Sequence, residues 1–179
     1  IILWIEFLAL ISKIFQKNKF KDKVLRFLYK AMSLLYLLSL FFFIIVVESY
    51  YQNLKLFIIY SVLTAILSDI GGLVFGKTFK GKKLTKISPN KTIAGSIGSF
   101  IFSLLLIPIF YQELIVFNIL TLVIITLIIS FASQLGDLFI SFLKRKAKVK
   151  DTSDLLPGHG GFLDRLDGVI LSIPVGFIM

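Results

Sequence analysis

The sequence predicts an all-α integral membrane protein, a polytopic bundle of about six transmembrane helices. Three observations predict it. Hydrophobic residues make up 57% of the chain and the mean hydropathy is +0.93. Long apolar runs alternate with short polar segments, and basic residues gather in every second segment. Because a soluble domain of 179 residues is rarely this apolar, we expect a lipid bilayer to surround most of the chain.

A transmembrane helix needs about 20 mainly apolar residues. Six runs meet this requirement wholly or in part: Ile1–Phe15, Ala31–Val47, Leu56–Phe75, Ile93–Tyr111, Leu114–Phe142, and Gly168 to the end. The chain starts without methionine and both ends fall within apolar runs, so we expect truncation at the N-terminus and leave it open at the C-terminus. The fifth run is long, and we expect it to bend or to continue beyond the membrane near Gly136.

The distribution of lysine and arginine predicts an orientation. Lys13–Lys30 holds seven basic residues, Lys77–Lys91 six and Lys144–Lys150 five. The alternate segments are nearly bare, with one lysine in Glu48–Lys55 and none in Tyr111–Glu113. Basic loops face the cytoplasm under the positive-inside rule. We therefore expect the three basic segments on the cytoplasmic side, in a bacterial inner membrane or an equivalent one.

Composition also excludes several classes of chemistry. The chain has no cysteine, which excludes disulfides, zinc–thiolate sites and cysteine nucleophiles. The net charge is +10, but the aromatic residues lie in apolar runs rather than among the lysines. Anionic lipid headgroups and phosphorylated substrates are therefore better partners for this charge than nucleic acid.

Two aspartates fall within the expected spans, Asp69 and Asp137. Carboxylates at such positions usually face a polar cavity and pair with a cation, although an interfacial aspartate paired with a lysine is the alternative. Asp137 shares a predicted helix face with Ser141 and with Lys144 or Arg145. This combination suits a metal-bound phosphate. A helix that simply ends in a basic cluster would explain the cations but not the aspartate and serine.

The stretch PGHGGFLDRLD concentrates polar chemistry near the end of the chain. Its glycines predict an irregular turn whose N–H groups could hold phosphate at a helix N-terminus. We expect His159 to contact substrate. Asp164 and Asp167 lie one helical turn apart and could ligate Mg²⁺. The alternative is an amphipathic helix start, with Asp164 near the positive end of the helix dipole.

The segment KISPNKT offers two hydroxyls and an ammonium group, from Ser88, Thr92 and Lys91, just before a span. These groups could hold a phosphorylated substrate. A capped helix start with lysines at the membrane surface would explain the same residues.

The stretch SQLGDLFISFLKRKAKVKDTSDLLPGHGGFLDRLDG closely resembles the signature of the CTP:phosphatidate cytidylyltransferases, also called CDP-diacylglycerol synthases. SDIGGLVFGK and KISPNKT resemble the two upstream motifs of this family. The resemblance covers residues 68–179. We therefore interpret residues 1–179 as a single membrane domain, with N-terminal helices in residues 1–67 and the catalytic part in residues 68–179.

The resemblance implies an enzyme of phospholipid synthesis that transfers the cytidylyl group from CTP to phosphatidic acid, giving CDP-diacylglycerol and pyrophosphate. It implies Mg²⁺ as cofactor, with a second metal or a monovalent cation left open, and a homodimer as the usual assembly.

The residues that match these motifs are assigned roles through the resemblance and their chemistry. The catalytic candidates are Asp137, Lys144 and Asp164. The metal ligands are Asp137 and Asp164, with Asp167 as a third carboxylate. The substrate-binding candidates are Ser88, Lys91, Ser141, Arg145, His159, Gly160, Gly161 and Arg165.

Three other functions remain open from sequence, and one of them is a catalytically inactive homologue or fragment that only assembles with partners. A CTP-dependent polyprenol or phytol kinase would transfer a terminal phosphate to a lipid alcohol and release CDP. A membrane transporter or channel would also use intramembrane aspartates.

Overall fold

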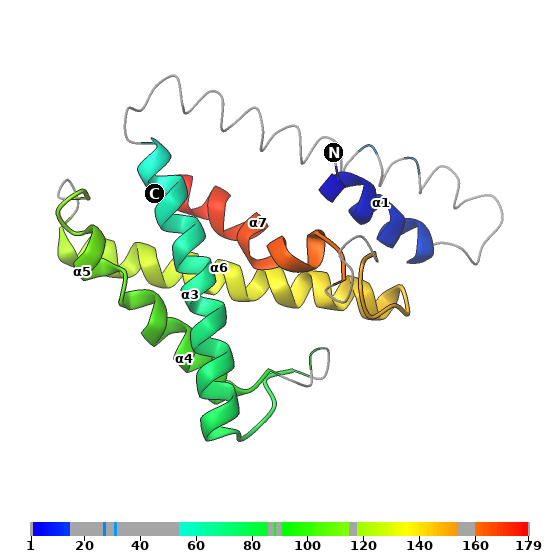
Figure 1. Cartoon of the computed structure of the whole chain (residues 1–179), viewed down its shortest axis with the longest axis horizontal. Helices are drawn as coiled ribbons and strands as arrows, with labels where there is room; N and C mark the ends of the chain where they lie inside the picture. The colour runs from blue at the N-terminus through cyan, green and yellow to red at the C-terminus, as the bar shows by residue number, and fades with distance from the viewer. Residues whose placement is uncertain are drawn as a thin grey trace. The chain divides into compact units, whose positions relative to one another are not determined.

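The protein is described by a computed structural model that covers residues 2–14, 27, 31, 54–85, 88, 91–114, 118–153 and 160–178. These residues are mainly helical, and within them no β-strand forms beyond an isolated antiparallel bridge between Lys83 and Thr92. The all-α prediction is confirmed. The helices in Figure 1 are α1 (Ile2–Ile14), α3 (Leu54–Phe79), α4 (Ile93–Leu104), α5 (Ile107–Phe110), α6 (Ile119–Lys146) and α7 (Leu163–Ile178).

The chain forms two compact units. The first unit comprises Ile1–Gln52 and Phe139–Leu166. The second comprises Asn53–Leu138 and Asp167–Met179. Helices α6 and α7 each contribute residues to both units.

Three helical segments are long and apolar enough to cross a membrane: Lys55–Phe79, Ile93–Phe110 and Ile119–Lys146. They correspond to the third, fourth and fifth predicted runs. The second predicted run, Ala31–Val47, lies almost wholly outside the described residues. Helices α1 and α7 have 13 and 16 residues and are shorter than these spans, so the total of six stays a prediction.

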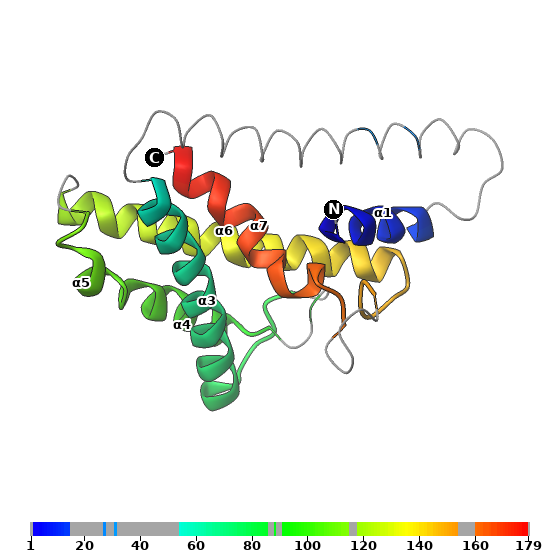
Figure 2. The same ribbon diagram turned by 45° about the horizontal axis from the view of Figure 1, so that its top comes forward.

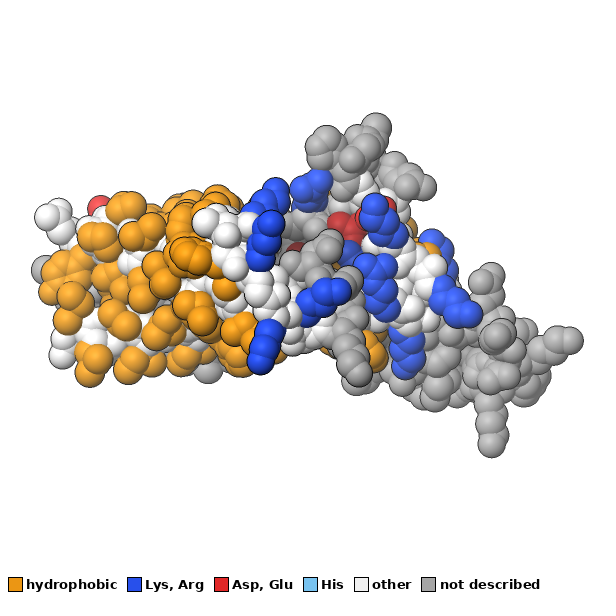
Figure 3. Space-filling model, turned by 90° about the horizontal axis from the view of Figure 1, so that it is seen from below, with side chains coloured by type: hydrophobic (Ala, Val, Ile, Leu, Met, Phe, Trp, Pro, Cys, Tyr) orange, Lys and Arg blue, Asp and Glu red, His pale blue; other side chains and the backbone are white. Residues whose placement is uncertain are grey.

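The surface of the second unit is apolar where a soluble protein would be polar. Large exposed side chains include Ile66, Leu73, Ile97 and Ile101, which are 43–56% exposed. Figure 3 shows hydrophobic side chains gathered over the helices of this unit. The buried positions of the spans instead hold many hydroxyls: Ser61, Thr64, Ser68, Ser99, Ser103, Thr126, Ser130 and Ser133. Apolar groups outside and small polar groups between helices are typical of membrane helix packing.

Glycines allow α3 and α4 to pack closely, and the two helices lie side by side in Figures 1 and 2. A Cβ added at Gly95 would meet the Gly72 carbonyl oxygen at 2.7 Å. A Cβ added at Gly98 would overlap the Phe75 side chain and lie 2.7 Å from the Gly71 carbonyl oxygen. Any larger residue at these positions would push the helices apart.

The core of the second unit centres on Tyr60 of α3. Its hydroxyl is 2.5 Å from Thr126 Oγ1 of α6, and its ring meets Phe110 edge-on. A second hydroxyl pair, Ser68 and Ser130, joins the same two helices at 3.0 Å. The apolar residues of this core are Leu106, Ile107, Leu114, Leu122, Ile125 and Ile129.

Helix α6 continues through Gly136 without ending. Its 28 residues give a length of about 42 Å at 1.5 Å per residue, against about 30 Å of hydrocarbon in a bilayer. This length favours the prediction that the helix extends beyond the membrane. Within the second unit, a Cβ added at Gly136 would lie 2.5 Å from the Asp167 carbonyl oxygen, so the glycine permits close approach of α7.

Candidate active site

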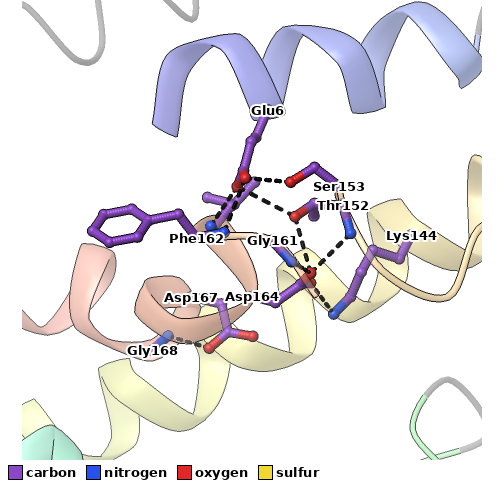
Figure 4. Close-up of polar contacts among 10 residues, drawn as sticks. Glu6, Lys144, Thr152, Ser153, Gly161, Phe162, Asp164, Asp167 and Gly168 are labelled. Carbon is purple, nitrogen blue, oxygen red and sulfur yellow. Dashed lines mark hydrogen bonds and ion pairs between the residues drawn. The ribbon is translucent and has the colours of Figure 1, made fainter. Parts of the chain in front are cut away.

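The carboxylate of Asp164 lies at the centre of a hydrogen-bond network in the first unit. Lys144 Nζ donates to its Oδ1 at 2.7 Å. Its Oδ2 accepts from Thr152 N at 2.8 Å, from Thr152 Oγ1 at 3.0 Å and from Gly161 N at 2.9 Å. Figure 4 shows these donors converging on Asp164. The aspartate is therefore held in one orientation by three separate segments of the chain.

These contacts keep Asp164 ionised. Burial by itself raises the pKa of this carboxyl group, but the hydrogen bonds from Lys144, Thr152 and Gly161 outweigh burial and bring the pKa below its ordinary value of 3.8. Donors that bond to the charged form of an acid favour that form. Asp164 is thus a carboxylate throughout the physiological pH range.

The end of α6 explains why Thr152 reaches Asp164. Val149 N donates to the Lys144 carbonyl and Lys148 N to the Arg145 carbonyl, both in the pattern of a Schellman motif. Lys148 has a φ of 58°, the left-handed conformation that this motif requires. The motif ends the helix and reverses the chain, which brings Thr152 back beside the start of α7.

The glycines before α7 are needed for close packing within the protein. Gly160 has a φ of 81°, which favours glycine, and an added Cβ would lie 3.1 Å from Asp164 Oδ2. A Cβ at Gly161 would overlap Thr152 Oγ1. The predicted use of the backbone N–H groups of this segment to hold phosphate stays a prediction, and the Gly161 N–H itself donates to Asp164.

Glu6 of α1 completes this network and was not among the residues selected from sequence. It is only 2% exposed, and it accepts from Ser153 Oγ at 2.5 Å and Phe162 N at 2.9 Å through Oε1. Its Oε2 accepts from Leu163 N at 2.5 Å and Thr152 Oγ1 at 3.3 Å. Figure 4 shows Glu6 pointing from α1 to the start of α7. The one available signal was a lone carboxylate in the apolar stretch WIEFLAL.

The second unit contains another lysine–carboxylate pair, between Lys91 Nζ and Asp137 Oδ2. Both side chains are partly exposed, at 27% and 24%. Asp69 of α3 interacts electrostatically with both groups. The two intramembrane aspartates singled out from sequence therefore belong to one cluster, with Lys91 as their cation.

The loop between α3 and α4 brings Lys91 to this cluster. Leu84 N donates to the Lys91 carbonyl at 2.7 Å and Lys91 N to the Ser88 carbonyl at 3.1 Å, which closes a tight turn. Thr92 caps α4 by accepting from Gly95 N at 3.0 Å. The capped helix start considered from sequence is confirmed, and it leaves the Lys91 ammonium beside Asp137.

The remaining predicted residues have different surroundings. Ser141 and Arg145 lie on α6, and Arg145 is exposed. Arg165 is exposed in the first turn of α7. Asp167, in the second unit, is 9% exposed and accepts from Gly168 N at 2.8 Å. His159 lies outside the described residues.

The predicted polar stripe is helical, since Asp137, Ser141 and Lys144 all lie on α6. However, each charged member pairs with a residue outside this helix, Asp137 with Lys91 and Lys144 with Asp164. In the part of the chain that the structure describes, three or more aspartate, glutamate or histidine side chains do not gather as a metal site. A shared cation between Asp137 and Asp164, which belong to different units, stays a prediction.

Comparison with known proteins identifies the family. The sequence model of the cytidylyltransferase family matches residues 1–179. The chain belongs to this family. The resemblance drawn from the motifs is thereby confirmed.

Curated relatives named phosphatidate cytidylyltransferase match much of the chain. The Rickettsia typhi protein is 46% identical over 61% of this chain and 51% of its own length. The Rickettsia prowazekii protein is 41% identical over 78% and 63%, and the Staphylococcus aureus protein 36% identical over 94% and 64%. The chain thus spans about half to two thirds of the length of these relatives.

Proposed function

We propose that this chain contains the catalytic part of a phosphatidate cytidylyltransferase. A phosphate oxygen of phosphatidic acid attacks the α-phosphorus of CTP. A new phosphorus–oxygen bond forms, the bond between the α- and β-phosphates breaks, and pyrophosphate leaves. The products are CDP-diacylglycerol and pyrophosphate. The relatives named above support this activity.

The observation that carries the proposal is the pairing of Lys144 with a fully oriented Asp164. Two polyanions must meet in this reaction, so the enzyme needs fixed positive charge beside acidic groups that can bind a cation. Lys144 and Lys91 supply ammonium groups for phosphate oxygens, each next to a carboxylate. Fixed charges of this kind stabilise the charge that develops on the phosphates and the leaving group.

The oxygen donors fit Mg²⁺, which prefers one or two carboxylates completed by water and substrate phosphates. Asp164 Oδ1 accepts one bond, from Lys144, whereas Oδ2 accepts three, so Oδ1 is the freer oxygen for a cation. Asp164 would contribute one carboxylate to the ion, and Asp137 and Asp167 stay the further carboxylate ligands that the sequence predicts. Bound Mg²⁺ would neutralise charge on the nucleotide and the leaving pyrophosphate.

The apolar surface of the spans supports a membrane-embedded enzyme whose lipid substrate stays in the bilayer. We infer that the basic segments face the cytoplasm, where CTP is available, and that the membrane is the bacterial inner membrane. We also propose that the enzyme acts as a homodimer.

The test is CTP- and Mg²⁺-dependent synthesis of CDP-diacylglycerol by the purified full-length protein in lipid nanodiscs. We expect one pyrophosphate for each CDP-diacylglycerol. Release of CDP with phosphorylation of a lipid alcohol would instead indicate a lipid kinase. Ion flux without turnover of CTP would indicate a transporter.

A further inference from the structure

Glu6 is a buried carboxylate without a cationic partner among the described residues. Burying an ionised group costs free energy unless its oxygens are hydrogen-bonded. Three donors meet this need directly: the Ser153 hydroxyl and the backbone N–H groups of Phe162 and Leu163. The Thr152 hydroxyl is a fourth contact, but its single proton is shared between Glu6 and Asp164. The Glu6 carboxylate is therefore a buried hydrogen-bond acceptor of the first unit.

The two N–H groups belong to the start of α7. The first N–H groups of a helix lack partners within the helix and carry partial positive charge. Glu6 accepts from Phe162 N and Leu163 N, so a carboxylate from a distant helix caps α7. Asp164, the next residue of α7, is thereby fixed at the level of the backbone.

The two hydroxyls belong to Thr152 and Ser153, in the segment that also holds the Asp164 carboxylate. Thr152 Oγ1 lies 3.3 Å from Glu6 Oε2 and 3.0 Å from Asp164 Oδ2, so one hydroxyl lies between both acids. Thr152 N also donates to Asp164. Glu6 thus contacts both segments whose alignment determines where Asp164 points.

We propose that Glu6 is a positioning residue for the cytidylyltransferase reaction. It holds residues 152–153 and the start of α7 together, and so keeps Asp164 in its place beside Lys144. This inference rests on the proposed function. Small displacements of a reacting or metal-binding group lower the rate of the chemical step more than they weaken substrate binding. The role belongs to α1, which lies outside the motif segments quoted above.

The experiment compares Glu6→Gln with Glu113→Gln in the full-length protein in nanodiscs. Glu113 is exposed and lies in the second unit, so it controls for loss of one carboxylate. We expect Glu6→Gln to lower kcat about tenfold or more, to leave KM for CTP and phosphatidate within about twofold, and to raise the Mg²⁺ concentration needed for half-maximal rate. Glu113→Gln should resemble wild type.

Ser153→Ala provides a milder variant, since it removes one donor but leaves the carboxylate in place. In a double-mutant cycle, the effects of Glu6→Gln and Ser153→Ala on kcat should be less than additive, because both act through one contact. Amide hydrogen exchange should speed up in residues 160–166 of Glu6→Gln and stay unchanged in α3.

The outcomes separate the two proposals. If wild type forms no CDP-diacylglycerol, the proposed function fails. If amide hydrogen exchange in residues 160–166 is also unchanged in Glu6→Gln, then Glu6 does not hold the start of α7 in place. If wild type is active and Glu6→Gln keeps its kcat and Mg²⁺ dependence, the positioning role is refuted while the function stands. Additive effects in the double-mutant cycle would refute it as well.

Discussion

Lys144 and Asp164 form a direct ion pair across 20 residues of sequence, with 2.7 Å between Nζ and Oδ1. The lysine comes from the last turn of α6 and the aspartate from the first turn of α7. Their side chains are only 14% and 9% exposed, so solvent screens the pair weakly. The pair joins the two sequence motifs that carry the resemblance to the cytidylyltransferases.

Replacing Lys144 by methionine should abolish most activity. The change keeps an unbranched apolar stem but removes the ammonium group, which leaves the Asp164 carboxylate without its cation. We expect kcat/KM to fall about 100-fold or more, which corresponds to about 2.7 kcal/mol of transition-state stabilisation. CDP-diacylglycerol formation measures it. Lys146→Met, an exposed position on the same helix, is the control and should stay within about twofold.

Asp164 should make stability depend on pH only under acidic conditions. Because folding lowers the pKa of this group below 3.8, the carboxylate stabilises the folded state above its unfolded pKa, and this contribution disappears as pH falls through the folded value. Thermal unfolding of wild type and Asp164→Asn should therefore differ by a constant amount between about pH 5 and 8. The difference should shrink below about pH 4. A difference that already shrinks near pH 6 would contradict the lowered pKa.

Neutralising the pair in the second unit should reduce turnover without unfolding the protein. Asp137→Asn keeps the shape of the side chain, Lys91→Gln shortens it only slightly, and neither side chain is fully buried. We expect Asp137→Asn to lower kcat/KM at least 100-fold, and Lys91→Gln about 10- to 100-fold. Turnover assays and thermal unfolding midpoints measure both effects. Lys82→Gln, an exposed lysine of the same loop, should behave as wild type. Full activity of Asp137→Asn would show that the Asp137 carboxylate is not needed for the reaction.

Close packing of α3 on α4 can be tested with one substitution at two positions. Gly98→Ala would overlap Phe75, whereas at Gly76 the nearest atom to an added Cβ is Thr92 Oγ1 at 3.3 Å. We expect Gly98→Ala to destabilise the second unit by about 1–3 kcal/mol through overpacking, and Gly76→Ala to cost clearly less. Unfolding in detergent followed by circular dichroism compares them. Equal destabilisation would argue against the close crossing.

Much of the site could be predicted from sequence because its residues stand in compact motifs. The sequence offered Asp137, Lys144 and Asp164 as catalytic residues, and their catalytic roles stay predictions. The structure places Asp137 and Lys144 on α6 and Asp164 on α7, and each takes part in an ion pair. Their partners could not be predicted. Lys144 was expected to act together with Asp137 on one face of the helix, but it pairs with Asp164 instead. The lysine that pairs with Asp137 is Lys91, which comes from a loop. Helical periodicity specifies which residues share a face and not which helix that face meets.

Glu6 shows the same limit more sharply. Its hydrogen-bond partners lie 146 to 157 residues away, and no local pattern of sequence connects them. From sequence, a lone carboxylate in an apolar helix shows only that burying its charge would cost free energy. The folded chain offsets this cost, because the exposed N–H groups of α7 and the hydroxyls of Thr152 and Ser153 supply the bonds that burial requires.

The order of amino acids is sufficient to specify an all-α membrane protein, because apolar run length must match the thickness of the hydrocarbon layer. It also specifies the family, because the motifs have a distinctive order and spacing. Folding adds the pairing of lysines with aspartates and the use of Glu6 as a cap. These depend on where the chain turns back, at the Schellman motif after α6 and at the glycines before α7, and so on contacts between residues remote in sequence.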